Sequence, residues 1–284
     1  IRIHGTDKVT AGRPIAPLPG DEDALTSVFT REVSARLVGA GFTECCHYSL
    51  RDAAELERTL GADKAALVAM DNPLTAEQTH LRASLVPGLA GALALNLSVH
   101  ADPHGLFEVG TVFRPQADGT VREFISVAFA IVAEPVTRSW KSREAFDALR
   151  AKRLLQDVAA LAGVAAIRLS FAAATGGLWQ ADHAAALVDR GRAAEGACGV
   201  LDLRWTRSLG LKSSVIAGEV YFPRSAFAEA RKIPRFEAFS SFPPVTKDVA
   251  VIVPVDVAAA EVESRVRQGA SKAAGKEFVL ESVN

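Results

Sequence analysis

The stretch Phe107-Glu108-Val109-Gly110-Thr111-Val112-Phe113 (107–113) decides the fold. It alternates with a period of two, which is typical of a β-strand with one buried face. Pro115, Asp118 and Gly119 then supply turn residues, and a second apolar run follows at 123–132. Two such runs joined by a short turn predict an antiparallel hairpin.

Helices are predicted on both sides of this hairpin. Apolar residues at steps of three and four predict a helix that starts near the capping residues 21–23 and ends at Gly39. Thr75 and Gln78 fit a capping box that would open a short helix. The remaining helices are expected at 52–60, 87–99 and 142–162.

Strands are expected around the same hairpin at 42–50, 166–172, 185–189, 197–203 and 216–222. They dominate after residue 100, whereas helices cluster before it. This order favours an α+β fold, an antiparallel sheet with flanking helices, over a parallel βαβ repeat.

Two linkers divide the chain into three expected domains. The Pro-rich stretch 12–20 favours an extended linker, so residues 1–20 form a tail and linker. Residues 21–235 form the core domain, and 236–284 hold a second linker and a partial domain. In that last part, a strand at 248–253, a helix at 256–270 and a strand at 277–283 predict the first half of a ferredoxin-like β-α-β unit.

Composition excludes several classes of protein. The 284 residues are 49% hydrophobic, which is enough for a core, and the formal charge of -1 argues against a free-standing nucleic-acid binder. The three cysteines are too few for a disulfide framework, so we expect reduced core thiols and a cytoplasmic location. No apolar run is long enough to span a membrane. The chain lacks an initiator Met and a signal peptide, so we expect it to be part of a longer protein.

The residues point to no self-contained active site. There is no phosphate-binding glycine loop and no nucleophile motif, and Pro103 disrupts the helix that a zinc pair at His100 and His104 would need. We therefore predict no catalytic residue and no metal ligand. Glu108 is interpreted either as a catalytic acid or a ligand, or as a structural carboxylate that bonds a neighbouring loop. Arg82 is read as a phosphate binder or as a buried or interfacial ion pair.

Four stretches, taken together and in order, resemble the beta subunit of bacterial phenylalanyl-tRNA synthetase. The most specific is Asn72-Pro73-Leu74-Thr75 followed by Leu81-Arg82-Ala83-Ser84-Leu85-Val86-Pro87-Gly88-Leu89 and by the strand 106–113. The others are the segments 2–9, 41–50 and 242–253. By this resemblance the chain is a carboxy-terminal fragment: the end of the winged-helix-like module, the catalytic-like domain and the start of the ferredoxin-fold anticodon-binding domain.

The resemblance implies a class II synthetase fold and a heterotetramer of two alpha and two beta chains that charges tRNA(Phe) with L-phenylalanine. The alpha chain would carry the chemistry, with ATP and magnesium needed by the whole enzyme and no cofactor held by this fragment. In active class II cores a Phe-Arg-x-Glu motif holds ATP. Here Phe113-Arg114-Pro115-Gln116 keeps Arg114 but loses the acid.

The function expected from these observations is assembly with the alpha subunit and tRNA positioning. Arg82, Leu89, Leu93 and Leu97 are the candidate subunit interface. Arg235 and Lys247, from a basic cluster that also contains Arg231 and Lys232, are the candidate tRNA contacts. The alternative is that this cluster is a solvated linker. Two alternatives are a standalone RNA-binding or interaction module and a self-sufficient ligase that uses Arg114.

Overall fold

The computed structural model describes residues 5–8, 21–60, 67–99, 105–116, 118–133, 146–164, 169–174, 177–189, 194–227, 245–257 and 259–274, with Ile3, Gly12, Phe236, Pro243 and Leu280. The chain divides into two units, residues 1–232 and 233–284. The two domain boundaries expected from the sequence stay predictions.

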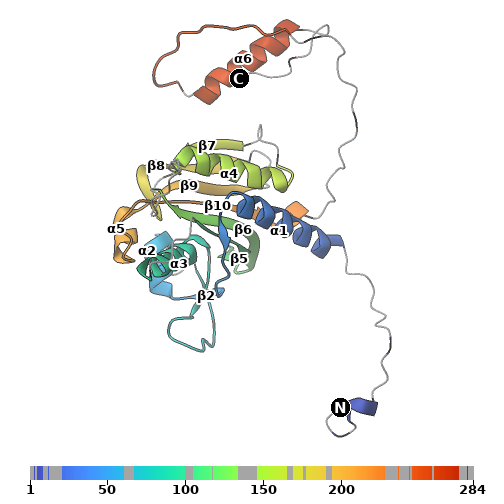
Figure 1. The fold of residues 1–284 in the computed structure, drawn as a ribbon, viewed down its shortest axis with the longest axis vertical. Helices are drawn as coiled ribbons and strands as arrows, with labels where there is room; N and C mark the ends of the chain where they lie inside the picture. The colour runs from blue at the N-terminus through green and yellow to red at the C-terminus, as the bar shows by residue number, and fades with distance from the viewer. Residues whose placement is uncertain are drawn as a thin grey trace. The chain divides into compact units, whose positions relative to one another are not determined.

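A seven-stranded sheet in the order β1-β5-β6-β10-β9-β8-β7 forms the centre of the first unit (Figure 1). The predicted hairpin is confirmed, because β5 (Leu106–Pro115) pairs antiparallel with β6 (Val121–Val132). Of the remaining neighbours, β1 alone is parallel to its partner β5. The other strands of the sheet are β1 (Thr43–Glu44), β7 (Leu169–Ala173), β8 (Trp179–Asp189), β9 (Glu195–Leu201) and β10 (Val215–Pro223).

Helices cover both faces of this sheet (Figure 1). One face, called the α4 face below, packs against α1 (Asp21–Gly39) and α4 (Ala148–Leu161). The opposite face, called the α3 face, packs against α3 (Val86–Ser98). Side chains along β6 alternate between the two, so that Phe129 lies in the core of the α4 face and Ala128 in that of the α3 face.

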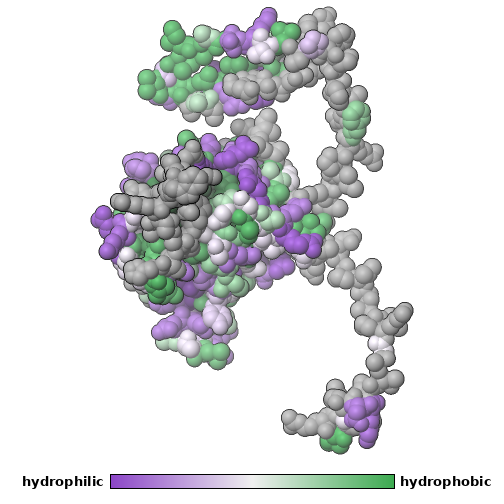
Figure 2. Space-filling view, in the orientation of Figure 1, coloured by the Kyte–Doolittle hydropathy of each residue, from purple (hydrophilic) through white to green (hydrophobic). Residues whose placement is uncertain are grey.

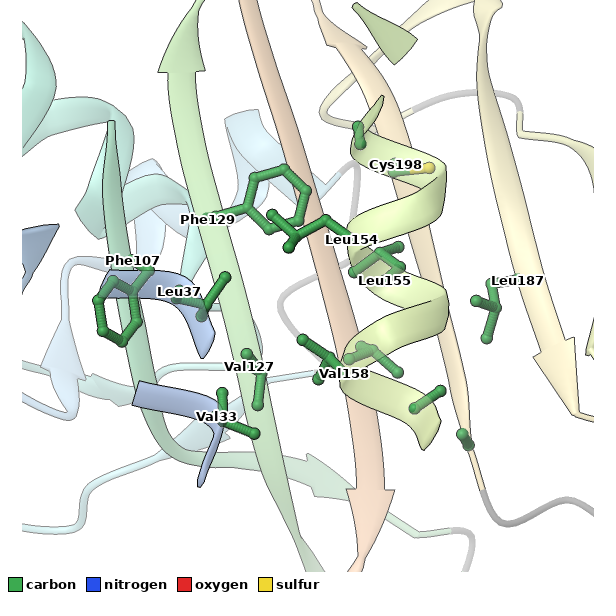
Figure 3. Close-up of a cluster of buried hydrophobic side chains, with 14 of the residues drawn as sticks. Val33, Leu37, Phe107, Val127, Phe129, Leu154, Leu155, Val158, Leu187 and Cys198 are labelled. Atoms are coloured by element: carbon green, nitrogen blue, oxygen red, sulfur yellow. The ribbon is translucent and has the colours of Figure 1, made fainter. Parts of the chain in front are cut away.

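The core of the α4 face is built from aliphatic residues around aromatic rings. Leu154, Leu155 and Val158 of α4 and Val33 and Leu37 of α1 converge on the sheet (Figure 3). The rings of Phe42, Phe129 and Phe146 meet edge to face, with centroids 5.6 to 6.2 Å apart. This spacing and orientation are those preferred by aromatic pairs.

Two predicted elements differ from the structure in the first half of the chain. The strand expected at 42–50 is reduced to β1 and β2 (Leu50–Arg51). Between them, Cys45 N still donates to the Phe107 carbonyl of β5, but the backbone of His47 bonds to the side chains of Glu108 and Arg82 instead of a strand. Thr75 opens a single turn rather than a helix, because β4 (His80–Leu81) starts soon afterwards. Strand β4 pairs with β2 and with β3 (Val68–Ala69) in a second, three-stranded sheet. The helix α2 (Ala53–Leu60) lies between β2 and β3 in the chain.

Two further boundaries are set by aspartate caps. α4 begins at Ala148 rather than at 142, since the Asp147 carboxylate accepts from the Arg150 amide at 2.8 Å; residues 142–145 lie outside the described residues. The strand expected to reach 203 ends at Leu201, because Asp202 caps α5 (Leu203–Ser208), a helix that the sequence did not predict.

The second unit matches the expected β-α-β pattern in its helix, α6 (Ala259–Ala274). The strand prediction at 248–253 is wrong for this structure, since these residues belong to no sheet. A strand needs a partner for its backbone groups. The predicted partner, 277–283, lies outside the described residues except for Leu280.

Gly218→Ala tests the packing of the α4 face. Gly218 pairs directly with Phe129 across β10 and β6, and a Cβ there would lie 2.6 Å from Cζ of the Phe129 ring. Because that ring is fully buried, we expect a loss of about 1–3 kcal/mol in the free energy of unfolding, measured by urea denaturation. Gly91→Ala in α3, where a Cβ meets open space, should be neutral or stabilising.

Candidate functional site

Two buried carboxylates lie on the α3 face of the sheet, one on each side of Ala128. Glu108 on β5 and Glu219 on β10 both pair with Ala128 on β6. Their exposed fractions are 2% and 1%. Since a buried carboxylate is costly unless it is hydrogen-bonded, the partners of these two residues define the candidate site.

Glu108 is held by Arg82 and His47. Its Oε1 accepts from Nη1 of Arg82 at 2.6 Å and from the backbone amide of His47 at 3.3 Å, and Oε2 lies 2.6 Å from Nδ1 of His47. A carboxylate can only accept, so Nδ1 is the protonated nitrogen of the imidazole. Burial opposes ionisation of Glu108, but the bonds from His47 and the charge of Arg82 outweigh it and lower the pKa of the carboxyl.

Arg82 ties the segment between β1 and β2 to β5. Its guanidinium donates to the carbonyl oxygens of Thr111 at 3.0 Å and His47 at 3.2 Å as well as to Glu108. It occupies the space beside Gly110, where a Cβ would collide with Nη2. The interpretations of Glu108 as a structural carboxylate and of Arg82 as a buried ion pair are therefore confirmed.

Glu219 accepts hydrogen bonds from four donors. Leu85 N donates at 2.8 Å, Ser126 Oγ at 2.6 Å and Tyr221 Oη at 2.7 Å, and Ser84 Oγ is the fourth donor. Burial raises the pKa of Glu219, and the four hydrogen bonds oppose that rise. Sequence reasoning missed this residue, although a lone acid in the apolar run 215–222 is the same signal that marked Glu108.

Arg114 is engaged by neighbours within the chain. Its guanidinium carbon lies 4.2 Å from the centroid of the Tyr221 ring and 5.0 Å from that of Phe124. It also forms an ion pair with Glu195, whose side chain is 51% exposed. The cation is thus stacked and paired on the same face as Glu219.

The four candidate interface residues lie largely inside the first unit. Leu89 and Leu93 are fully buried against the chain's own sheet, Arg82 is 6% exposed, and Leu97 packs at the margin of that core. The apolar spacing that motivated the interface prediction is therefore used within the chain. On the same helix Leu95 is 66% exposed, as is Val99 just after it.

The structure tests neither candidate tRNA contact. Lys247 is exposed in the second unit, whereas Arg235, like Arg231 and Lys232, lies outside the described residues. Both stay predictions.

The chemistry available to the described residues is limited. Ser84 and Ser126 bond to Glu219, but all three side chains are at most 3% exposed, so a substrate does not reach them. No three His, Cys, Asp or Glu of the described residues gather as metal ligands, and His100 and His104 lie outside that part of the chain.

The cysteines differ in their burial. Cys198 is a buried thiol whose pKa burial raises to about 11, but Cys46 is exposed, so the prediction of core thiols is wrong for Cys46. No helix in the described ranges is long and apolar enough to cross a lipid bilayer.

The arrangement of the sheet and helices is that of a class II aminoacyl-tRNA synthetase core. Two structures of pyrrolysyl-tRNA synthetase from Desulfitobacterium hafniense align with TM-scores of 0.51 and 0.50. Each alignment covers 72% of this chain, with 65% and 68% of the other chains, at 15% sequence identity. The expected fold class is confirmed by this likeness.

The chain belongs to the family described as phenylalanyl tRNA synthetase beta chain CLM domain, whose model matches residues 10–222. Two curated relatives are the phenylalanine–tRNA ligase beta subunits of Synechococcus sp. (strain JA-2-3B'a(2-13)) and Xanthomonas euvesicatoria pv. vesicatoria, each 31% identical over 94% of this chain. The alignments cover 32% and 33% of those proteins, so the chain spans about a third of their length. The family resemblance read from the sequence is confirmed.

Glu108→Gln tests the buried ion pair. We expect a loss of about 3–5 kcal/mol in the free energy of unfolding at neutral pH, because the substitution leaves the Arg82 charge buried without its partner. A carboxyl whose native pKa is lowered stabilises the fold above its ordinary pKa, and that contribution is lost as pH falls through the native value. The variant should therefore lose stability less steeply in acid than the original chain.

The matched control for this test is Glu123→Gln, which removes an exposed pair with Arg224. It should change the free energy of unfolding by less than about 1 kcal/mol. Equal losses for the two variants, measured by urea denaturation from pH 3 to 8, would contradict a stabilising role for the buried pair.

Proposed function

We propose that this chain is the part of a phenylalanine–tRNA ligase beta subunit that assembles with the alpha subunit and positions tRNA(Phe), without catalysing the reaction. The relatives named as beta subunits support the link to the ligase. The proposed non-catalytic role is inferred from the surroundings of Arg114. Its charge is paired with Glu195 and its guanidinium carbon lies 4.2 Å from the centroid of the Tyr221 ring, so it does not present a free guanidinium to a phosphate.

The substrates and partners of the whole enzyme follow from the same proposal. The alpha subunit would activate L-phenylalanine with ATP and magnesium in an (alpha-beta)2 heterotetramer, and we place that enzyme in the cytoplasm. Within this chain we retain a tail at 1–20, a catalytic-like domain at 21–235 and the start of an anticodon-binding domain from 236. Without positioned charges, this domain would gain little transition-state stabilisation for phosphoryl chemistry.

Reconstitution with a cognate alpha subunit tests the proposal directly. We expect a complex by native mass measurement, and ATP–pyrophosphate exchange that requires the alpha subunit. Arg114→Gln in this chain should leave the rate of exchange within about twofold, because a catalytic arginine would cost tenfold or more. Exchange by this chain alone, lost in Arg114→Gln, would instead support a self-sufficient ligase.

The position of the alpha-subunit contact is tested by Leu95→Asp. The Leu95 side chain is exposed near the end of α3, so a charge there costs the isolated fold little but would disrupt an apolar interface. We expect at least a tenfold loss of affinity for the alpha subunit, by titration calorimetry. Leu149→Asp on α4, where the side chain is 74% exposed, is the matched control and should retain binding.

We expect tRNA(Phe) to contact the second unit through Lys247. Lys247→Gln should weaken tRNA(Phe) binding by the reconstituted enzyme a few-fold and flatten its salt dependence by about one unit of slope. Lys272→Gln, an exposed lysine on α6, is the control. If the isolated chain bound tRNA with equal affinity and an equal salt slope, the alternative of a standalone RNA-binding module would be supported.

A further inference from the structure

Glu219 differs from an ordinary buried acid because its partners come from three separate elements. Leu85 and Ser84 precede α3, Ser126 lies on β6 and Tyr221 lies on β10. Four donors therefore converge on one carboxyl group from different directions. Such convergence is how proteins bind a carboxylate ligand.

We propose that the α3 face contains a closed carboxylate-binding site that the chain fills with its own Glu219, and that this internal ligand fixes the first turn of α3 on the sheet. The proposal concerns the fold of this chain and stands apart from the ligase function. It assigns Glu219 as a positioning residue.

The start of α3 shows why the helix needs this ligand. Leu85 occupies the N-cap position but has no side chain that can cap, so the helix provides no acceptor of its own there. Glu219 accepts from the amide of Leu85, and Ser84 Oγ accepts from the amide of Val86 at 3.2 Å. Because Ser84 also donates to Glu219, the amides of Leu85 and Val86 both depend on this one carboxyl group.

The site is polar and largely closed to solvent, and its occupant can be removed without removing the four donors. Glu219 is 1% exposed, and Ser84 and Ser126 are 3% and 0% exposed. Truncation to alanine removes Cγ and the carboxyl group while keeping Cβ. The missing atoms are those of acetate, and the four donors would remain to bind it.

The test measures hydrogen exchange at the start of α3 in Glu219→Ala. We expect exchange of the Leu85 and Val86 amides to accelerate at least tenfold, with the amides of α4 on the opposite face changing much less. Acetate should slow this exchange and raise the folding equilibrium constant, by about tenfold when its concentration is ten times its dissociation constant. Sodium chloride at the same ionic strength should do neither.

Glu195→Ala is the matched control. It removes a carboxylate from the same face, but that side chain is 51% exposed and ion-paired rather than enclosed. Acetate should give no added stabilisation to this variant or to the original chain. An equal response of all three proteins to acetate would show a general salt effect and would overturn the proposed site.

A second pair of variants covers the case in which Glu219→Ala does not fold. Glu219→Gln keeps the shape and one acceptor oxygen for Leu85, so it should largely retain slow exchange at the start of α3. Ser126→Ala removes one donor while the carboxyl group stays in place, so exchange there should rise without any response to acetate. Two results together would overturn the positioning role. In Ser126→Ala, exchange of the Leu85 and Val86 amides would be unchanged. In Glu219→Gln, exchange of the same two amides would be as fast as exchange of the α4 amides.

Discussion

The need to satisfy two carboxylates inside one sheet face organises the first unit of this chain. Glu108 and Glu219 flank Ala128, and neither reaches solvent. An unpaired charge in such a place would cost several kcal/mol. Ser126 and Tyr221 on β6 and β10 meet part of this need, but Arg82, His47 and the start of α3 come from outside the seven strands. The sheet therefore dictates where the preceding loop and helix must lie.

The same constraint supports the proposed non-catalytic role of this domain. The charged and polar side chains described above lie on the α3 face, but each is bonded to another group of the chain. Arg114 pairs with Glu195 and stacks on Tyr221, whose hydroxyl donates to Glu219. Electrostatic catalysis requires groups that are preorganised toward the charge that develops on a substrate. A class II fold and a family match thus coexist with a face whose polar groups are directed inward.

Local periodicity was enough to predict the framework but not the contacts between its parts. The hairpin at 106–132, α1, α3 and the strand at 215–223 follow from alternation or helical spacing. Glu108 and Arg82 could be singled out separately, yet nothing local indicates that they pair. The break in the strand at 42–50 depends on that pairing, because Glu108 and Arg82 bond the backbone of His47. α5 was missed because its signal is one aspartate cap at the end of a strand.

The interface prediction shows why sequence cannot separate a core from a contact surface. Leu89, Leu93 and Leu97 recur at helical spacing, which is the pattern for any apolar neighbour, whether it is the chain's own sheet or another subunit. The tertiary structure assigns Leu89 and Leu93 to the sheet and leaves Leu95 exposed on the same helix. A helix anchored on one side by its leucines and at its start by Glu219 has a defined outer surface. Association with another chain would then cost little further ordering of α3, since its position is already determined by the buried face.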